Sequence, residues 1–144
     1  MLRRIENFNP PEIEVALELI NEALSKPEQS SYRCIVALET KANEEIYLGY
    51  ICFGRTPMTD FTYDLYWVAV DPAFRGRGLG GQLLHAMDES LRHSGGRVIR
   101  VETSSMETYH GSLKFYLNEG FEIAGRIPNF YREKDDLVIL FKTL

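Results

Sequence analysis

Residues 67–83 of the chain read WVAVDPAFRGRGLGGQL, and this stretch decides the fold. An apolar run from Leu65 to Val70 stops at Asp71-Pro72, which is typical of a strand that ends in a turn. A loop rich in glycine and arginine follows. Beyond the loop, large apolar residues recur at helical spacing: Leu79, Leu83, Leu84, Met87 and Leu91. The stretch therefore predicts a strand, a glycine-rich turn and the N-terminus of a helix.

The glycine-rich turn has the chemistry of an anion site. Glycines leave backbone N–H groups accessible and permit positive φ angles. The first turn of a helix adds unpaired N–H donors and the positive end of the helix dipole. We therefore expect the turn to hold a phosphate or pyrophosphate group. The alternative is an ordinary glycine-rich turn with two solvated arginines, Arg75 and Arg77.

Three known patterns place glycines between a strand and a helix, and two of them do not fit. A P-loop needs Lys-Ser or Lys-Thr after its last glycine, whereas Gln82-Leu83 follows here. The dinucleotide-binding fingerprint needs another spacing for its third glycine. The third pattern, Arg/Gln-x-x-Gly-x-Gly, is matched at every position by the segment from Arg75 to Gly80. This segment resembles the acetyl-CoA pyrophosphate loop of the GNAT N-acetyltransferase superfamily.

Two further segments carry the same resemblance. Residues 65–72 (LYWVAVDP) look like the fourth strand of that family and its exit. Residues 113–122 (LKFYLNEGFE) look like its helix ending in Phe-Tyr and the Gly-Phe entry into the next strand. The resemblance covers residues 46–144, and the first 45 residues match only in length and pattern. Residues 98–103 and 126–136 also resemble ribosomal-protein alanine N-acetyltransferases.

The resemblance implies an enzyme that moves an acetyl group from acetyl-CoA to a primary amine by direct attack in a ternary complex. The acceptor would be a small amine or a protein or peptide amine, and relatives are often homodimers. The implied acetyl-CoA contacts are Trp67, Val68, Ala69, Val70, Arg75, Gly76, Arg77, Gly78, Leu79, Gly80 and Gly81. The alternative function is a non-catalytic acyl-CoA-binding regulatory module that keeps the loop without turnover.

Length and composition indicate one globular domain spanning residues 1–144. Hydrophobic residues make up 44% of the chain and charged residues 26%, as in ordinary soluble domains. The apolar runs are too short for a transmembrane span, so we expect no membrane partner. Residues 1–6 (MLRRIE) lack the apolar stretch of a signal peptide. These features predict a cytoplasmic protein.

Charge and cysteine content restrict the partners. The net charge is −5, from 21 acidic and 16 basic residues, which argues against nucleic acid and is compatible with a cationic amine. Cys34 and Cys52 lie in apolar, strand-like runs, which favours buried reduced thiols over a disulfide. The three histidines have no metal-ligand spacing with the cysteines, so no metal site is expected.

The order of the expected elements predicts an α+β (mixed α/β) fold. Its central sheet would be mixed and mostly antiparallel, with helices on both faces. Residues 65–70 and 98–103 would form a parallel pair through a right-handed crossover. The other expected elements are strands at 2–5, 34–38, 46–53, 121–127 and 137–141, and helices at 10–24 and 109–118.

In GNAT proteins, the parallel pair splays apart at its C-terminal ends and one strand carries a bulge. The resemblance therefore implies that the backbone of residues 67–70 pairs with the pantetheine arm of acetyl-CoA, as an added strand would. An N–H near Val68 would then point at the thioester carbonyl. The alternative is a fully paired, buried strand, which the Val-Ala-Val sequence suits equally well.

The resemblance also implies catalytic roles. Tyr116 occupies the position of the tyrosine that protonates the departing CoA sulfur in many members. The alternative for Tyr116 is a core tyrosine with a solvated tip. Glu102 is the candidate base, directly or through water, and the alternative is a solvated glutamate or one paired with Arg100.

Three residues are expected on the acceptor side. Asp64 is a lesser candidate base, and Phe130 and Tyr131 would wall the acceptor site or form an apolar plug on a hairpin. One position departs from the family pattern. Many members carry an asparagine seven residues before the helical tyrosine, and Tyr109 stands there in this chain.

Overall fold

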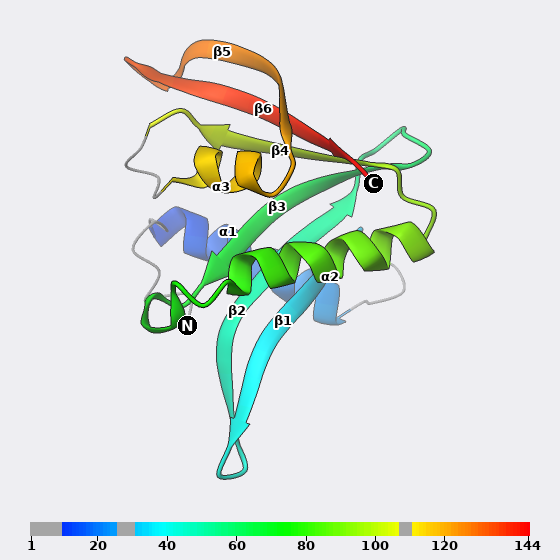
Figure 1. Ribbon diagram of the computed structural model, residues 1–144, viewed down its shortest axis with the longest axis vertical. Helices are drawn as coiled ribbons and strands as arrows, with labels where there is room; N and C mark the ends of the chain where they lie inside the picture. The colour runs from blue at the N-terminus through cyan, green and yellow to red at the C-terminus, as the bar shows by residue number, and fades with distance from the viewer. Residues whose placement is uncertain (1–9, 26–30, 107–110) are drawn as a thin grey trace.

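The computed structural model describes residues 10–25, 31–106 and 111–144. Its six strands form one sheet in the order β1-β2-β3-β4-β6-β5 (Figure 1). Neighbouring strands are antiparallel except for the β3–β4 pair, which is parallel. The mixed, mostly antiparallel sheet is therefore confirmed. The elements are α1 (Pro10–Ser25), β1 (Tyr32–Lys41), β2 (Glu44–Arg55), β3 (Thr62–Val70), a 3-10 turn (Pro72–Phe74), α2 (Leu79–His93), β4 (Val98–Ser104), α3 (Ser112–Asn118), β5 (Glu122–Arg132) and β6 (Asp135–Thr143).

Helices cover both faces of the sheet, as the sequence predicts. In Figure 1, α2 crosses in front of the strands and α1 passes behind them. The front core is formed by the periodic apolar face of α2 against residues such as Ile51, Phe53 and Ile99. A smaller core behind the sheet contains Tyr50, with Ile20 of α1 packed against it. Burial of each large apolar side chain stabilises the fold by about 1.5–3 kcal/mol.

The parallel pair separates along its length. β3 and β4 pair over only four positions, from Thr62–Val98 to Leu65–Val101. Beyond this point the two strands diverge, as Figure 1 shows. On its other edge, β3 pairs with β2 through a register shift between Trp67 and Leu65, so Tyr66 is the extra residue of a bulge. The splay and the bulge that the resemblance implies are therefore both present.

Several element boundaries differ from the predicted ones. α3 begins at Ser112, after Gly111 in a left-handed conformation (φ 71°), whereas the sequence predicts a helix from residue 109. β5 continues to Arg132 instead of stopping at residue 127, and its register with β6 breaks between Ile127 and Arg132. Pro128 lies in that break, because proline has no N–H to donate to a ladder. Tyr109 and the strand expected at 2–5 lie outside the described residues.

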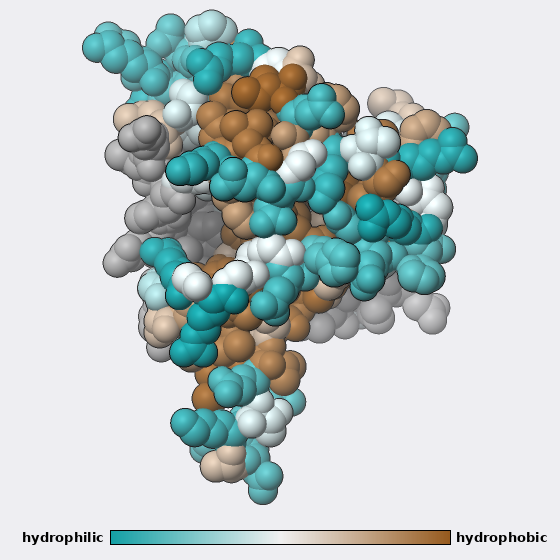
Figure 2. All heavy atoms as spheres, in the orientation of Figure 1, coloured by the Kyte–Doolittle hydropathy of each residue, from teal (hydrophilic) through white to brown (hydrophobic). Residues whose placement is uncertain are grey.

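Two of the places where apolar side chains are exposed lie at opposite ends of the molecule (Figure 2). One lies on β5 and includes Ile123 and Ile127, and the other lies on the β1–β2 hairpin and includes Val36, Leu38 and Tyr47. Homodimer formation remains a prediction. No helix within the described residues is both long and apolar enough to span a bilayer.

Candidate active site

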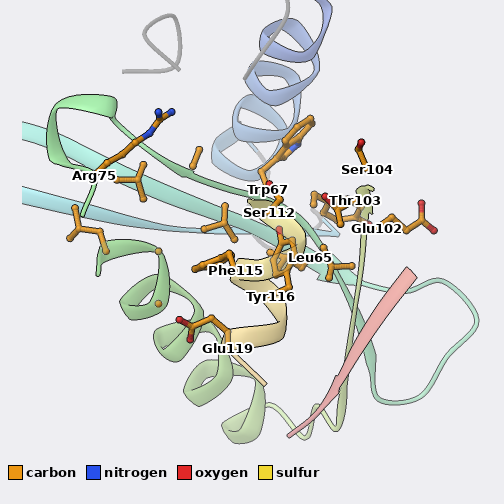
Figure 3. A pocket seen from close by; sticks show the side chains of 18 of the residues that line it. Leu65, Trp67, Arg75, Glu102, Thr103, Ser104, Ser112, Phe115, Tyr116 and Glu119 are labelled. Atoms are coloured by element: carbon orange, nitrogen blue, oxygen red, sulfur yellow. The ribbon is translucent and has the colours of Figure 1, made fainter. Parts of the chain in front are cut away.

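A cavity of about 950 Å³ opens where β3 and β4 diverge (Figure 3). Its walls come from the C-terminal half of β3, the glycine-rich loop, the first turn of α2, the end of β4, and α3. One cavity therefore joins the predicted anion loop to both predicted catalytic side chains, Tyr116 and Glu102. Of the predicted contact residues, Trp67, Val68, Ala69, Val70, Arg75, Gly76, Gly78, Leu79, Gly80 and Gly81 line it.

The glycine-rich loop presents backbone donors at one end of the cavity. Gly76 and Gly78 have φ angles of 77° and 71°, in the left-handed region that favours glycine. Gly78 is the N-cap of α2 and provides no side-chain cap, and the first turn contains no acidic residue. The first helical bond found here runs from the Gln82 N–H to the Gly78 carbonyl, so the earlier N–H groups of the turn have no partner within the helix. This arrangement fits an anionic group such as a pyrophosphate.

The two arginines of the loop are placed differently. Arg75 lines the cavity and lies at its loop end in Figure 3. Arg77 does not line it, and its guanidinium carbon lies 5.1 Å from the centre of the Phe74 ring. Cation–π contact accounts for this second position. Of these two loop arginines, Arg75 is therefore the one placed to meet a ligand in this cavity.

Close packing of α2 on α3 forms the floor of the cavity. A Cβ added at Gly80 would lie 3.2 Å from the Phe115 ring, and one added at Gly81 would lie 2.8 Å from Oε1 of Glu119. Phe115 and Glu119 both line the cavity, and Figure 3 shows Glu119 pointing toward α2. Sequence reasoning missed both residues as wall residues. The adjacent glycines of α2 were the available signal, because they permit close approach of another helix.

Tyr116 is buried in the front core and also lines the cavity. Its ring packs edge-on against Phe121, with centroids 5.4 Å apart, and lies 5.3 Å from Phe115. Burial raises the pKa of the Tyr116 hydroxyl above its ordinary value. The hydroxyl therefore keeps its proton at neutral pH, which is the state that a proton donor requires.

Glu102 projects from the opposite face of the sheet. Val101 is buried in the front core, and successive strand residues alternate, so Arg100 and Glu102 face the α1 side. Figure 3 shows the Glu102 side chain pointing away from Tyr116. Glu102 Oε1 lies 3.4 Å from Nη1 of Arg100, so the pairing that the sequence leaves open is present. The gap between β3 and β4 is what connects the two faces.

Asp64 is a partner of Arg100. Its Oδ1 accepts a hydrogen bond of 2.7 Å from Arg100 Nε, and its side chain is only 10% exposed. This hydrogen bond raises the pKa of the Arg100 guanidinium above its ordinary value. Asp64 lines the cavity, but the ion pair occupies one of its carboxylate oxygens. Sequence reasoning did not assign Arg100 to the site.

The two aromatic residues expected on the acceptor side differ in their relation to the cavity. Tyr131 lines the cavity, whereas Phe130 does not and is 54% exposed. Their rings stack edge-on at 5.0 Å. Phe130 therefore contacts Tyr131 from outside the cavity.

Comparison with known proteins agrees with this geometry. Residues 30–123 match the sequence model of a family described as an acetyltransferase (GNAT) domain. The chain belongs to the GNAT acetyltransferase family. A GNAT-family protein of known structure from Desulfovibrio desulfuricans is 36% identical and superposes with a TM-score of 0.91, over 99% of this chain and 87% of that one.

Two other relatives extend the GNAT comparison. The N-alpha-acetyltransferase RimI of Mycobacterium tuberculosis is 35% identical over 86 residues, which is 60% of this chain and 50% of that protein. An aminoglycoside 6'-N-acetyltransferase solved with coenzyme A shares the fold, with 17% identity, a TM-score of 0.70, and coverage of 96% of this chain and 82% of that one. This chain spans half or less of the length of the curated relatives it matches.

Proposed function

We propose that this protein is an N-acetyltransferase that moves an acetyl group from acetyl-CoA to a primary amine by direct attack in a ternary complex. The observation that carries the proposal is the single cavity that runs from the α2 N-terminus to the gap between β3 and β4. One space therefore contains the N–H groups of the α2 first turn, a stretch of β3 that has no partner on its β4 edge, and titratable side chains. Membership of the GNAT family supports the same function.

The proposed acetyl-CoA contacts come from the loop and from β3. The first-turn N–H groups after Gly78 and the Arg75 side chain would hold the pyrophosphate. The β3 backbone beyond Leu65, where pairing with β4 ends, would hold the pantetheine arm as an added strand. Bound acetyl-CoA would supply the acetyl thioester. Val68 N–H is the proposed donor to the thioester carbonyl.

Two side chains would manage the protons. Tyr116, kept protonated by burial, would donate a proton to the CoA sulfur as it leaves. Glu102 would accept a proton from the acceptor amine, directly or through a water, on the other side of the gap. Their placement on opposite faces supports a path in which the amine approaches from the α1 side. Tyr116 would then protonate the sulfur, and Glu102 would deprotonate the amine.

The acceptor would be a small amine or a protein or peptide amine. Tyr131 and Asp64 line the acceptor end of the cavity in this proposal, and Phe130 supports the Tyr131 ring from outside. The 35% identity to a RimI protein, named as an N-alpha-acetyltransferase, supports including peptide N-termini among the candidates.

Isothermal titration of acetyl-CoA and CoA tests the binding step. We expect micromolar binding to the wild type and loss of binding in the Arg75→Ala/Gly78→Asp double variant, which removes a cation and adds an anion at the loop. Arg33→Ala is the matched control, because Arg33 is exposed, does not line the cavity and hydrogen-bonds Ser94. No binding by the wild type would contradict the proposal.

Release of free thiol from acetyl-CoA then tests turnover with a panel of amines. The panel contains spermidine, glycine, an aminoglycoside, and peptides with a free N-terminal alanine or an internal lysine. Thiol release that depends on one of these amines supports the enzyme. Micromolar binding without release for any of them would support the non-catalytic acyl-CoA-binding module instead.

A further inference from the structure

Three charged side chains form a continuous chain across the parallel strands. Asp64 on β3 accepts a 2.7 Å hydrogen bond from Nε of Arg100 on β4, and Arg100 Nη1 lies 3.4 Å from Glu102 Oε1. Asp64 and Glu102 each contact Arg100 through a different nitrogen. The planar guanidinium therefore holds the two carboxylates in a defined position relative to each other.

These three linked side chains lie where the two strands begin to separate. Asp64 and Arg100 are register partners in the parallel ladder, and pairing ends one step later at Leu65–Val101. Glu102 is the first β4 residue beyond the paired segment. The backbone of Glu102 therefore lacks a β3 partner, although β6 still pairs with it at Ile139. The Asp64–Arg100 contact links the side chains of β3 and β4 one register step before pairing ends at the gap that leads to Glu102.

The burial of the three side chains suggests which one anchors the others. The Asp64 side chain is 10% exposed, whereas those of Arg100 and Glu102 are 45% and 43% exposed. A buried carboxylate needs a charged partner, so Asp64 holds the guanidinium firmly. An exposed glutamate by itself samples many rotamers, and its ordering costs conformational entropy. Contact with an anchored guanidinium reduces that freedom.

We propose that Arg100, anchored by Asp64, is a positioning residue that orients Glu102 toward the gap between β3 and β4. The inference rests on the proposed function, in which Glu102 is the base. The ion pair uses Oε1 of Glu102, so within the described part of the chain Oε2 keeps its lone pairs for an acceptor amine or a water. Arg100 itself transfers no proton, because its guanidinium stays charged.

Kinetics with Arg100 variants test this role. The probe is the fastest amine among spermidine, glycine and a peptide with a free N-terminal alanine. Arg100→Gln is expected to lower kcat at least tenfold. It should leave the Kd for acetyl-CoA within twofold, because Arg100 lines the cavity but the proposed acetyl-CoA contacts come from the glycine-rich loop and β3. The kcat of Arg100→Lys should lie between those of the wild type and Arg100→Gln, because one ammonium cannot contact both carboxylates in the same geometry. Arg33→Gln, outside the cavity, should keep the wild-type rate.

A double variant separates positioning from a general structural role. If Arg100 acts through Glu102, then Arg100→Gln adds less than a twofold loss to Glu102→Asp, whose shorter carboxylate no longer reaches the same contact. A further tenfold loss in that background would overturn the proposal. An unchanged kcat in Arg100→Gln, or a weaker acetyl-CoA Kd with an unchanged kcat, would overturn it too.

A spectroscopic measurement needs no acceptor. In protein labelled with carboxyl-13C glutamate, the Glu102 resonance is identified by its loss in Glu102→Gln. We expect Arg100→Gln to shift the Glu102 resonance. Asp64→Asn should shift this resonance as well, although the contact of Asp64 described above is with Arg100 and not with Glu102. Shifts without any wild-type turnover would contradict the proposed function alone. Turnover with an unmoved resonance in both variants would overturn this inference alone.

Discussion

Replacement of Tyr116 by phenylalanine removes one hydroxyl from the wall of the cavity and nothing else. The ring keeps its edge-on contact with Phe121 at 5.4 Å and its contact with Phe115 at 5.3 Å. Such aromatic pairs contribute about 0.5–1.5 kcal/mol each beyond their buried area, and this contribution is retained. The free energy of unfolding should therefore change by less than about 1 kcal/mol.

The rate should change far more than the stability. General acid catalysis typically contributes about 10²–10⁴ in rate, which corresponds to about 3–5 kcal/mol of transition-state stabilisation. We expect Tyr116→Phe to lower kcat at least tenfold, because water in the cavity supplies part of the lost proton donation. The KM for acetyl-CoA should change little, since the loop and β3 provide its proposed contacts.

The pH dependence follows from the burial of Tyr116. An unburied tyrosine ionises near pH 10, and burial raises the pKa of Tyr116 above that value. The folded protein therefore binds more protons than the unfolded chain above pH 10. The contribution of this protonated tyrosine to the free energy of unfolding is therefore complete below pH 10, and it is lost as the pH rises through the folded-state pKa. The kcat profile should accordingly show no loss from Tyr116 ionisation between pH 6 and 9.

The assay is thiol release at saturating acetyl-CoA with the best amine from the panel, from pH 6 to 9. Tyr47→Phe is the matched control, because Tyr47 is 49% exposed on the β1–β2 hairpin and hydrogen-bonds Glu45 there. A Tyr116→Phe enzyme with wild-type kcat would refute the proton-donor role. A loss of kcat accompanied by a large fall in Tm would refute the claim that the hydroxyl acts in catalysis alone.

Substitutions at three other positions have definite expected outcomes. Lys142→Met should lower the free energy of unfolding by about 3 kcal/mol in urea denaturation, because it leaves Asp88 (5% exposed) without the 2.7 Å Lys142 partner; a change below about 1 kcal/mol would contradict this. Gly78→Ala should cost about 1 kcal/mol, since φ is 71° and a Cβ there meets nothing within 4 Å, and Gly78→Asn should cost less in the same titration. Glu119→Gln should tighten the calorimetric Kd for CoA about two- to fivefold by removing a negative charge beside the α2 first turn; weaker binding would show that Glu119 helps to hold the ligand.

Local patterns were sufficient to predict most of the fold. The start of α2 and the end of the strand before it follow from helical spacing, an apolar run and glycines, which act within a few residues. The GNAT resemblance added the splay and the bulge, which depend on partner strands far along the chain. The later start of α3 was missed although its signal, the left-handed Gly111 at the N-cap, is local. The extension of β5 past Pro128 was missed because it depends on pairing with β6 at Arg132–Asp135.

The sequence by itself determined the order of strand, glycine loop and helix, and with it the position of the anion site, because backbone conformation there is set by neighbouring residues. Only the tertiary structure decided which side chains meet. Asp64 and Arg100 are 36 residues apart and meet through the parallel register. Tyr116 and Glu102 line one cavity from opposite faces of the sheet. Such contacts depend on strand register and on packing between distant segments, which no local pattern encodes.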